Sequence, residues 1–391
     1  SWYYSNRQAA KPEVLSHLLK VCYPAEGEDG RALKEALKGT SIKAARLVEV
    51  AMYAPQWIDI IQEYLGWNGL KSGCYYFMAH MNERVEESKQ AMIAKYTPLT
   101  VEELQDGAFD IDWFRECYGL LGEKNFSLLY KAAKYISDGQ KHSRARKYAD
   151  AATGKVTLEQ LRAQIGAKRN KDLLMSYGLV PFEEDKKSDM VGRYQFIQNY
   201  AKEARQFGAQ RRASETKTAR IGLVNLSVHA GFADVTRLTL NMETELIREF
   251  IPYMSWTPVE DVEICLEINK DGKSGILCRK NGKQLKSLPS RLGKNPYVLK
   301  VKDAHKKLKD QYVRTKKMME ESMEGGDWFT AEEVLGLFKN PVVKAILEPL
   351  VFVREDRKNP PEPDFAGFAC PDPSEAFDGQ ALAAGNLNLR A

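Results

Sequence analysis

The chain has 391 residues, of which 43% are hydrophobic and 10% aromatic, so it is long enough for two or three domains and can fill real cores. This composition excludes a disordered chain, and the formal net charge of +5 does not by itself indicate a nucleic-acid partner. The chain contains no signal peptide and no apolar run of about 18 residues, so we expect no membrane span.

Basic residues gather in two stretches. Residues 131–171 contain 11 Lys or Arg against three Asp or Glu, and residues 270–317 contain 16 against three, whereas residues 318–391 contain six against 14. This asymmetry is typical of a nucleic-acid or other anionic partner, or of a basic surface that the acidic C-terminal part of the same chain covers. The alternative is that each run is an ordinary solvated helix face.

Residues 1–180 form the first predicted region, in which apolar residues recur at three- and four-residue steps and predict a series of helices. Pro12 opens the first helix, Gly66 ends another, and Thr100 with Glu103 is a capping box. Because short polar loops separate the helices and no strand alternation occurs, we expect an irregular HEAT- or armadillo-like array. The sequence shows no clean internal repeat.

Two groups of side chains in this region are candidates for a site. Trp57, Trp67, His80 and Trp113 form either an aromatic pocket or, as aromatic residues at helical spacing more often do, part of a core. His80 has no partner at metal-ligand spacing, so we expect no metal site.

The second group is basic and comprises residues 141–147 with Lys168, Arg169 and Lys171. It is able to track a phosphate backbone, or it is the exposed ridge of two helices.

Residues 181–192 are polar and acidic and are interpreted as a linker, and residues 193–256 as a helical junction. The junction carries the segment FGAQRRASE, with Arg211, Arg212 and Glu215. Paired guanidinium groups can bind phosphate or carboxylate, which predicts an anion site. The alternative is an internal pair between one arginine and Glu215 across one helical turn. Gly231 is placed as a helix stop and Asp234 as the N-cap of the next helix.

From residue 257 to 391 we expect a smaller α+β region. Residues 262–268 alternate in polarity like a half-buried strand, and turns at Asp271-Gly272 and Asn281-Gly282 predict an antiparallel β-meander. A long lysine-rich helix begins at Pro296, a capping box follows at Thr330, and Asn340-Pro341 starts a short helix. Further strands are expected at residues 350–353, 365–370 and 381–389.

The six cysteines are scattered without a CxxC pair, which is typical of thiols in a reducing compartment and favours a cytoplasmic location. The sequence contains no P-loop, no GxSxG elbow and no HExxH motif, so neither catalytic residues nor a cofactor can be assigned. We therefore expect a non-catalytic role.

Four stretches of the sequence resemble a known family. They are RLVEVAMYAPQWIDIIQEYLGWNGLKSGCYYFMAH, then KYISDGQKHSRARKYADAATGK with KRNKD, then FGAQRRASE with GFADVTRLTLNMETEL, and finally GKQLKSLP with the helices that follow it. With them the chain resembles the DUF4132 family preceded by a DUF5724-type helical region, as in bacterial proteins similar to the molybdate metabolism regulator. Members of that family are much longer, which implies an internal fragment here, truncated at its C-terminus. The resemblance implies a fold but no reaction.

The function expected from the sequence is a helical scaffold that binds a protein partner. Binding of nucleic acid through the basic segments is the alternative, and part of an enzyme whose catalytic residues cannot be identified here is a third. The candidate binding residues are Arg211, Arg212, Glu215, Lys168, Arg169, Lys171 and Lys286. The sequence does not give the oligomeric state.

Overall fold

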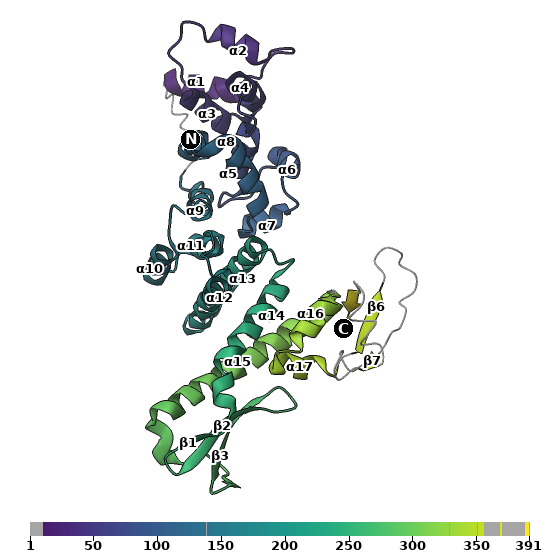
Figure 1. The fold of residues 1–391 in the computed structure, drawn as a ribbon. Helices are drawn as coiled ribbons and strands as arrows, with labels where there is room; N and C mark the ends of the chain where they lie inside the picture. Colours follow the sequence, from purple (N-terminus) through teal and green to yellow (C-terminus); the bar gives the residue numbers. More distant parts are fainter. Residues whose placement is uncertain are drawn as a thin grey trace, which may run out of the picture. The chain divides into compact units, whose positions relative to one another are not determined.

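The computed structural model describes residues 11–137, 139–327, 329–349, 351–355, 368–369 and 388–390. The chain divides into two compact units, Ser1–Ala233 and Asp234–Ala391, and each is described by itself. The described residues of the first unit form helices only, whereas the second unit combines helices with two four-stranded sheets (Figure 1). A mainly α fold with a smaller α+β part is thereby confirmed, while the likeness to HEAT or armadillo arrays stays a prediction.

The helices of the first unit follow one another with short connections. They are α1 (Lys11–Val21), α2 (Gly30–Ala36), α3 (Ala44–Tyr53), η1 (Pro55–Trp57), α4 (Ile58–Leu65), α5 (Leu70–Ala79), α6 (Glu87–Ile93), α7 (Val101–Asp106), α8 (Ile111–Ala132), η2 (Ala133–Tyr135), α9 (Ser143–Ala152), α10 (Leu158–Lys168), α11 (Lys171–Ser176), η3 (Tyr177–Leu179), α12 (Lys186–Glu203), η4 (Ala204–Gln206) and α13 (Ala209–Ala230).

The predicted start and stop signals explain where several of these helices begin and end. Thr100 and Glu103 form the capping box of α7, in which the Glu103 N–H donates to Thr100 Oγ1 at 3.2 Å and the Thr100 N–H donates to Glu103 Oε2 at 2.7 Å. Gly66 ends α4 and Gly231 ends α13, both in the left-handed conformation that glycine adopts without steric cost.

The core of the first unit is built around α5, in which nine of ten residues are buried. His80 and Trp113 lie in this core, where the indole Nε1 of Trp113 donates to Ser72 Oγ at 2.8 Å and its ring stacks on Tyr96. Trp57 and Trp67 are only partly buried. The core interpretation is therefore right for His80 and Trp113.

Residues 186–192, which we interpreted as part of a linker, are the first turns of α12. Asp185 caps this helix by accepting the Ser188 N–H at 3.1 Å. The fully buried Arg193 donates to both carboxylate oxygens of Asp189, at 2.8 and 2.6 Å, and to the Pro181 carbonyl at 2.9 Å. Residues 186–192 therefore lie in a capped helix, and the role of residues 181–192 as a linker stays a prediction. The predicted junction 193–256 contains residues of both units.

The second unit begins with helical segments, continues with the β-meander and then returns to helices. Its elements are α14 (Val235–Leu246), η5 (Ile247–Glu249), η6 (Ile251–Met254), β1 (Thr257–Val259), β2 (Val262–Ile268), β3 (Ser274–Lys280), β4 (Lys283–Gln284), η7 (Ser290–Lys294), α15 (Pro296–Gly325), β5 (Phe329–Thr330), α16 (Ala331–Leu337), α17 (Pro341–Leu347), β6 (Val351–Glu355), β7 (Phe368–Ala369) and β8 (Asn388–Arg390).

The β-meander has the predicted antiparallel order β1-β2-β3-β4, with Ile264 opposite Cys278 in the β2–β3 pair. Its second turn has positive φ at both Asn281 (48°) and Gly282 (76°), as a tight hairpin turn of this kind requires. The other sheet has the order β5-β8-β6-β7. Strands β6, β7 and β8 overlap the strands predicted at residues 350–353, 365–370 and 381–389. The remaining residues of the last two predictions lie outside the described residues.

Two clusters of apolar side chains form the core of the second unit. The first joins the inner face of the meander to the N-terminal half of α15 through Ile264, Leu266 and Val301. The second joins Leu240 of α14 and Met319 near the C-terminal end of α15 to α16 and α17. In the part of the chain that the structure describes, no helix combines the length and apolar character needed to cross a bilayer.

Candidate functional site

Arg169 and Glu215 lie at the centre of an ion-pair network in the first unit. Arg169 follows the last residue of α10 with φ at 46°, and its Nε and Nη2 donate to Glu215 Oε2 at 3.0 and 2.7 Å. Its Nη1 donates to Glu203 Oε2 at 2.7 Å and its Nη2 to the Tyr200 carbonyl at 2.9 Å. The side chain of Glu215 is only 3% exposed, so the network is anchored inside the protein.

Arg211 completes what we call the arginine network, which consists of Arg169, Glu203, Arg211 and Glu215. Its Nε donates to Glu215 Oε1 at 2.9 Å, across one turn of α13. The Arg211 guanidinium lies 3.6 Å from the ring centre of Phe207. The internal pair between Arg211 and Glu215 is therefore present. The Arg211 Nε–H that could bind an external anion is already bonded to Glu215.

The electrostatics of Glu215 follow from these contacts. Burial disfavours its charged form, but the hydrogen bonds from Arg169 and Arg211 outweigh burial and hold the pKa of Glu215 below its ordinary value. The carboxylate is therefore ionised at neutral pH and balances the two guanidinium groups. The arrangement is that of a structural junction between α10, α12 and α13.

Of the other predicted binding residues, Lys171 lies beside the arginine network, and Lys286 belongs to the second unit. Lys171 Nζ donates to Ser214 Oγ at 2.6 Å, next to Glu215. Arg212 and Lys168 are exposed and make no ion pair within the described residues. Lys286 is an exposed residue of the second unit, so it does not join the others in one compact unit.

The basic stretch of residues 141–147 also differs from the prediction. The guanidinium of Arg144 is buried and donates to four carbonyl oxygens, those of His80, Met81, Leu104 and Gln105. This residue neither tracks a phosphate backbone nor lies on an exposed ridge, because it satisfies buried carbonyl groups at the C-terminal ends of α5 and α7. Nothing in its local sequence distinguishes it from a surface arginine.

A groove of about 670 Å³ lies among α9, α10 and α11, with Lys168 on its wall. Its polar groups are largely satisfied internally, since Lys147 pairs with Asp172 at 3.2 Å and Asp150 accepts from the Tyr130 hydroxyl at 2.8 Å. Burial, together with the hydrogen bond to Asp150, raises the pKa of Tyr130 to about 12, so it stays a neutral hydrogen-bond donor. This pairing leaves Lys168 as the accessible charge of the groove.

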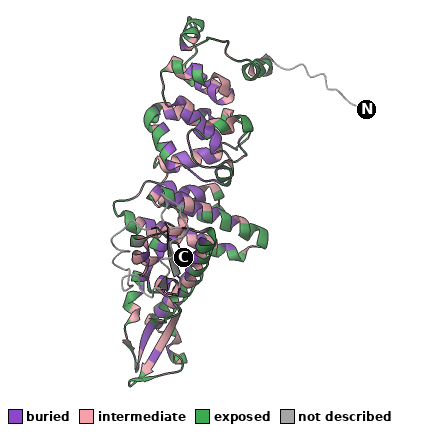
Figure 2. Ribbon diagram, turned by 90° about the vertical axis from the view of Figure 1, so that its right-hand side faces the viewer, coloured by how far each residue is buried: buried purple, intermediate pink, exposed green. Residues whose placement is uncertain are grey.

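The largest exposed group of apolar side chains belongs to α1. Val14, Leu15, Leu18, Leu19 and Val21, which we call the α1 face, are 37% to 53% exposed, and Figure 2 shows this helix mostly in the colour of exposed residues.

The α1 helix is held by its C-terminal end. Gln56 Nε2 donates to the carbonyls of Leu19, Lys20 and Cys22 at 2.8 to 3.0 Å, and Trp57 Nε1 donates to the Leu19 carbonyl at 2.9 Å. These bonds satisfy the last carbonyls of the helix and fix its position without covering its apolar side chains.

Among the described residues, no group of three or more His, Cys, Asp or Glu side chains is arranged to hold a metal ion. The described cysteines Cys22, Cys74, Cys117, Cys265 and Cys278 are free thiols, and Cys370 lies outside the described residues.

Comparison with known proteins agrees with the resemblance seen in the sequence. The model of DUF4132, a domain of unknown function, matches residues 282–383. No curated protein matches the chain, and no solved structure matches it. The model of DUF5724, a family of unknown function, matches residues 1–242, which is more than half of the chain, and the chain therefore belongs to this family.

Proposed function

We propose that the first unit is a protein-binding scaffold that receives an apolar helix of its partner on the α1 face. The single observation that carries this proposal is the exposure of five large apolar side chains on one 11-residue helix. Contiguous exposed apolar surface is unfavourable in water and commonly marks an interaction site. Leu15 and Leu18, separated by three positions, and Leu19, four positions beyond Leu15, provide the spacing at which one helix packs against another.

The fixed position of α1 supports the same proposal. Because Gln56 and Trp57 hold the end of the helix, a partner would meet a surface that is already ordered, and the entropic cost of binding would be lower. Lys20 is held over the Tyr53 ring at 4.5 Å and does not occupy the apolar stripe.

The experiment places the photoreactive residue p-benzoylphenylalanine at Leu18 in the full chain, in the cells that make the protein, and identifies the crosslinked protein. The same residue at Leu120 is the control, because Leu120 is a 54% exposed leucine of α8 that does not belong to the α1 face. We expect a crosslinked protein at Leu18 that is absent at Leu120.

The affinity of that protein is then measured with purified components. We expect Leu15→Glu to weaken binding at least about tenfold, which corresponds to 1.4 kcal/mol, and Leu120→Glu to leave it within about twofold. Absence of a protein crosslink at Leu18, or equal weakening by both substitutions, overturns the proposal.

Binding of nucleic acid is the second candidate function, and a specific feature of α15 favours it. Lys302, Lys306 and Lys309 are exposed, and none of them makes an ion pair within the described part of the chain. We expect a labelled single-stranded RNA to bind more weakly at about 200 mM than at about 50 mM salt, and replacement of the three lysines by glutamate to remove the binding. No binding at the lower salt excludes this candidate.

A further inference from the structure

We propose that the C-terminal ends of α10 and α12 and the N-terminal half of α13 form a basic surface that binds the phosphate backbone of a nucleic-acid duplex without reading its sequence. The cations of this basic surface are Lys168 of α10, Arg205 directly after α12, and Arg212 and Arg220 of α13. The surface belongs to the first unit and contains no residue of the α1 face or of α15. The proposal therefore rests on neither of the functions considered above.

The arginine network brings these cations together. Lys168, Arg205 and Arg212 each lie one or two positions from a member of that network in the sequence. The hydrogen bond from Arg169 Nη1 to Glu203 Oε2, at 2.7 Å, joins the end of α10 to the end of α12. Helices α12 and α13 pack side by side (Figure 1). The surface is therefore held in place by internal bonds, and a ligand does not have to order it.

The local charge is strongly positive. Residues 168–172 and 202–220 contain nine Lys or Arg against three Asp or Glu, an excess of six. All three carboxylates are already paired, since Glu203 and Glu215 accept from Arg169, and Asp172 pairs with Lys147 at 3.2 Å. Within the described part of the chain, four exposed cations make no ion pair, namely Lys168, Arg205, Arg212 and Arg220. The excess positive charge is therefore available to an external anion.

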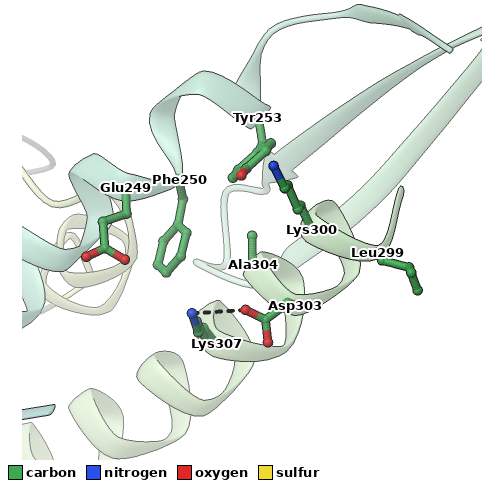
Figure 3. A pocket seen from close by; sticks show the side chains of 8 residues that line it. All are labelled: Glu249, Phe250, Tyr253, Leu299, Lys300, Asp303, Ala304 and Lys307. Atoms are coloured by element: carbon green, nitrogen blue, oxygen red, sulfur yellow. Dashed lines mark ion pairs between the residues drawn. The ribbon is translucent and has the colours of Figure 1, made fainter. Parts of the chain in front are cut away.

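The hollow beside α15 in the second unit has no such excess (Figure 3). It has a volume of about 400 Å³, and its lining contains Lys300 and Lys307 against Glu249 and Asp303. Lys307 Nζ pairs with Asp303 Oδ2 at 2.9 Å. Because these charges balance, the hollow does not favour an anionic ligand, whereas the basic surface does.

The length of the basic surface favours a ligand with many negative charges. Arg212, Thr216 and Arg220 follow one another at four-residue steps, and all three are exposed. The eight positions from Arg212 to Arg220 correspond to roughly 12 Å along the axis of α13. One phosphate group cannot reach both arginines at their helix positions, but a duplex carries one negative charge per about 1.7 Å of its axis.

The side chains between the cations favour nucleic acid over an acidic protein. A protein interface usually has an apolar core with a polar rim. Among the described residues, no large apolar side chain of the ranges 168–172 and 202–220 is exposed. The exposed residues Ala209, Ala213 and Thr216 are small and let a backbone come close to α13. A polar and strongly basic surface of this kind is typical of contacts with nucleic acid.

The aromatic residue of this surface favours a duplex over a single strand. Proteins that bind single strands stack the bases on aromatic side chains. Phe207 is the only aromatic residue in the ranges 168–172 and 202–220. The guanidinium groups of Arg211 and Arg169 already lie over its ring, at 3.6 and 5.3 Å from the ring centre. A duplex presents its phosphates on the outside and needs no stacking partner.

The test measures fluorescence anisotropy of a labelled DNA duplex of about 20 base pairs and mixed sequence, titrated with the full chain at several salt concentrations. Four phosphate contacts predict a slope of about −3.6 for the logarithm of the binding constant against the logarithm of the salt concentration. This slope corresponds to roughly 150-fold weaker binding at 200 mM than at 50 mM salt. A labelled single strand of the same length and a labelled polyglutamate peptide should each bind at least about tenfold more weakly than the duplex.

The protein variant combines Arg212→Gln with Arg220→Gln, and its matched control combines Arg84→Gln with Lys124→Gln. All four residues are exposed positions of the first unit without an ion pair among the described residues, so each variant loses two unpaired positive charges. We expect the first variant to bind at least about tenfold more weakly at 50 mM salt and to lower the slope to about −1.8, because two phosphate contacts are lost. The control should keep the slope and change the affinity by less than about twofold, and both variants should be as helical as the unchanged protein by circular dichroism.

Three results overturn the proposal. The first is absence of duplex binding at 50 mM salt. The second is a loss of affinity in the arginine variant that is no larger than the loss in the control. The third is binding of the single strand or of polyglutamate as tightly as the duplex. Since no residue of the α1 face or of α15 is changed, these results leave the crosslinking test at Leu18 and the lysine variants of α15 unaffected.

Discussion

Arg169 and Glu215 are 46 residues apart in the chain, yet the Arg169 guanidinium donates two hydrogen bonds to Glu215 Oε2, at 3.0 and 2.7 Å. Glu215 also accepts a hydrogen bond from Arg211, so one buried carboxylate holds two guanidinium groups. Removing the charge of Glu215 would leave both arginines without their common partner.

We expect Glu215→Gln to destabilise the protein by on the order of 3 kcal/mol at neutral pH, because breaking a buried ion pair leaves an uncompensated charge. Urea denaturation followed by circular dichroism measures the difference. Glu184→Gln is the control, since Glu184 is exposed and should change stability by less than about 0.5 kcal/mol. Equal effects of the two substitutions would show that the network does not stabilise the fold.

The same substitution has a defined pH dependence. The folded-state pKa of Glu215 lies below its ordinary value of about 4.5 because the hydrogen bonds from Arg169 and Arg211 outweigh burial. Its contribution is therefore fully present above pH 4.5 and is lost as the pH falls through the lowered value. The difference in stability between Glu215→Gln and the unchanged protein should shrink below pH 4.5, and a constant difference would contradict this.

Arg144 is the residue whose conservative replacement should be most damaging. Its guanidinium donates to four carbonyl oxygens in the core, and the compact ammonium of lysine cannot reach all of them. A hydrogen bond of a charged group contributes about 1.5–3 kcal/mol, and lysine would lose at least one of the four. We therefore expect Arg144→Lys to lower the free energy of unfolding, measured in urea, by on the order of 3 kcal/mol. The exposed Arg115→Lys should be neutral, and a neutral Arg144→Lys would refute the role assigned to these bonds.

Two glycines of the first unit should respond to alanine in opposite directions. A Cβ at Gly178 would lie 2.8 Å from Leu226 Cβ and 2.9 Å from Leu226 Cα, so Gly178→Ala should cost about 1–3 kcal/mol. A Cβ at Gly166, within α10, meets nothing within 4 Å, and Gly166→Ala should stabilise the helix by about 0.5–1 kcal/mol. Thermal unfolding of both variants tests the pair, and a shift in the same direction would contradict the packing of Gly178 against Leu226.

The buried histidines predict a loss of stability in mild acid. Burial lowers the pKa of His80 and of His229 to about 4, so both are neutral in the folded protein. Between about pH 6.5 and 4 the unfolded chain binds these protons and the folded protein does not, so stability falls as the pH falls. We expect a loss on the order of 2 kcal/mol per histidine between pH 7 and 5, measured by urea denaturation at each pH.

His80 provides the clearest variant for this experiment. Its Nδ1 donates to the Tyr76 carbonyl at 2.9 Å, while its Nε2 is buried without a hydrogen-bond partner. His80→Phe should therefore reduce the dependence on pH, whereas His17→Phe, at an exposed position, should not. An unchanged dependence in His80→Phe would exclude His80 as its source.

Local features of the fold could be predicted from the sequence where the interaction joins neighbours in the chain. The capping box of Thr100, the stop at Gly231 and the hairpin turn at Asn281 all depend on a few consecutive residues. The pair Arg211–Glu215 spans one helical turn and was predictable for the same reason.

Interactions between distant residues could not be predicted in this way. Arg169 meets Glu215 only because α10 ends in a left-handed residue and α13 passes nearby. Arg144 and Arg193 read as surface charges in the sequence, and only the tertiary fold shows that each satisfies buried carbonyl groups. The helical state of residues 186–192 was not predictable for the same reason, because Asp189 is the partner of the buried Arg193.

The helix α15 belongs to both cores of the second unit, with Val301 in the meander cluster and Met319 in the helical cluster. The neighbouring residues Val342 and Val343 of α17 repeat this division, since one belongs to each cluster. A shift of α15 along its axis would therefore disturb both clusters at the same time. Amide hydrogens of the meander and of α17 should exchange with solvent in a single concerted opening, which makes this unit one cooperative element and not two independent ones.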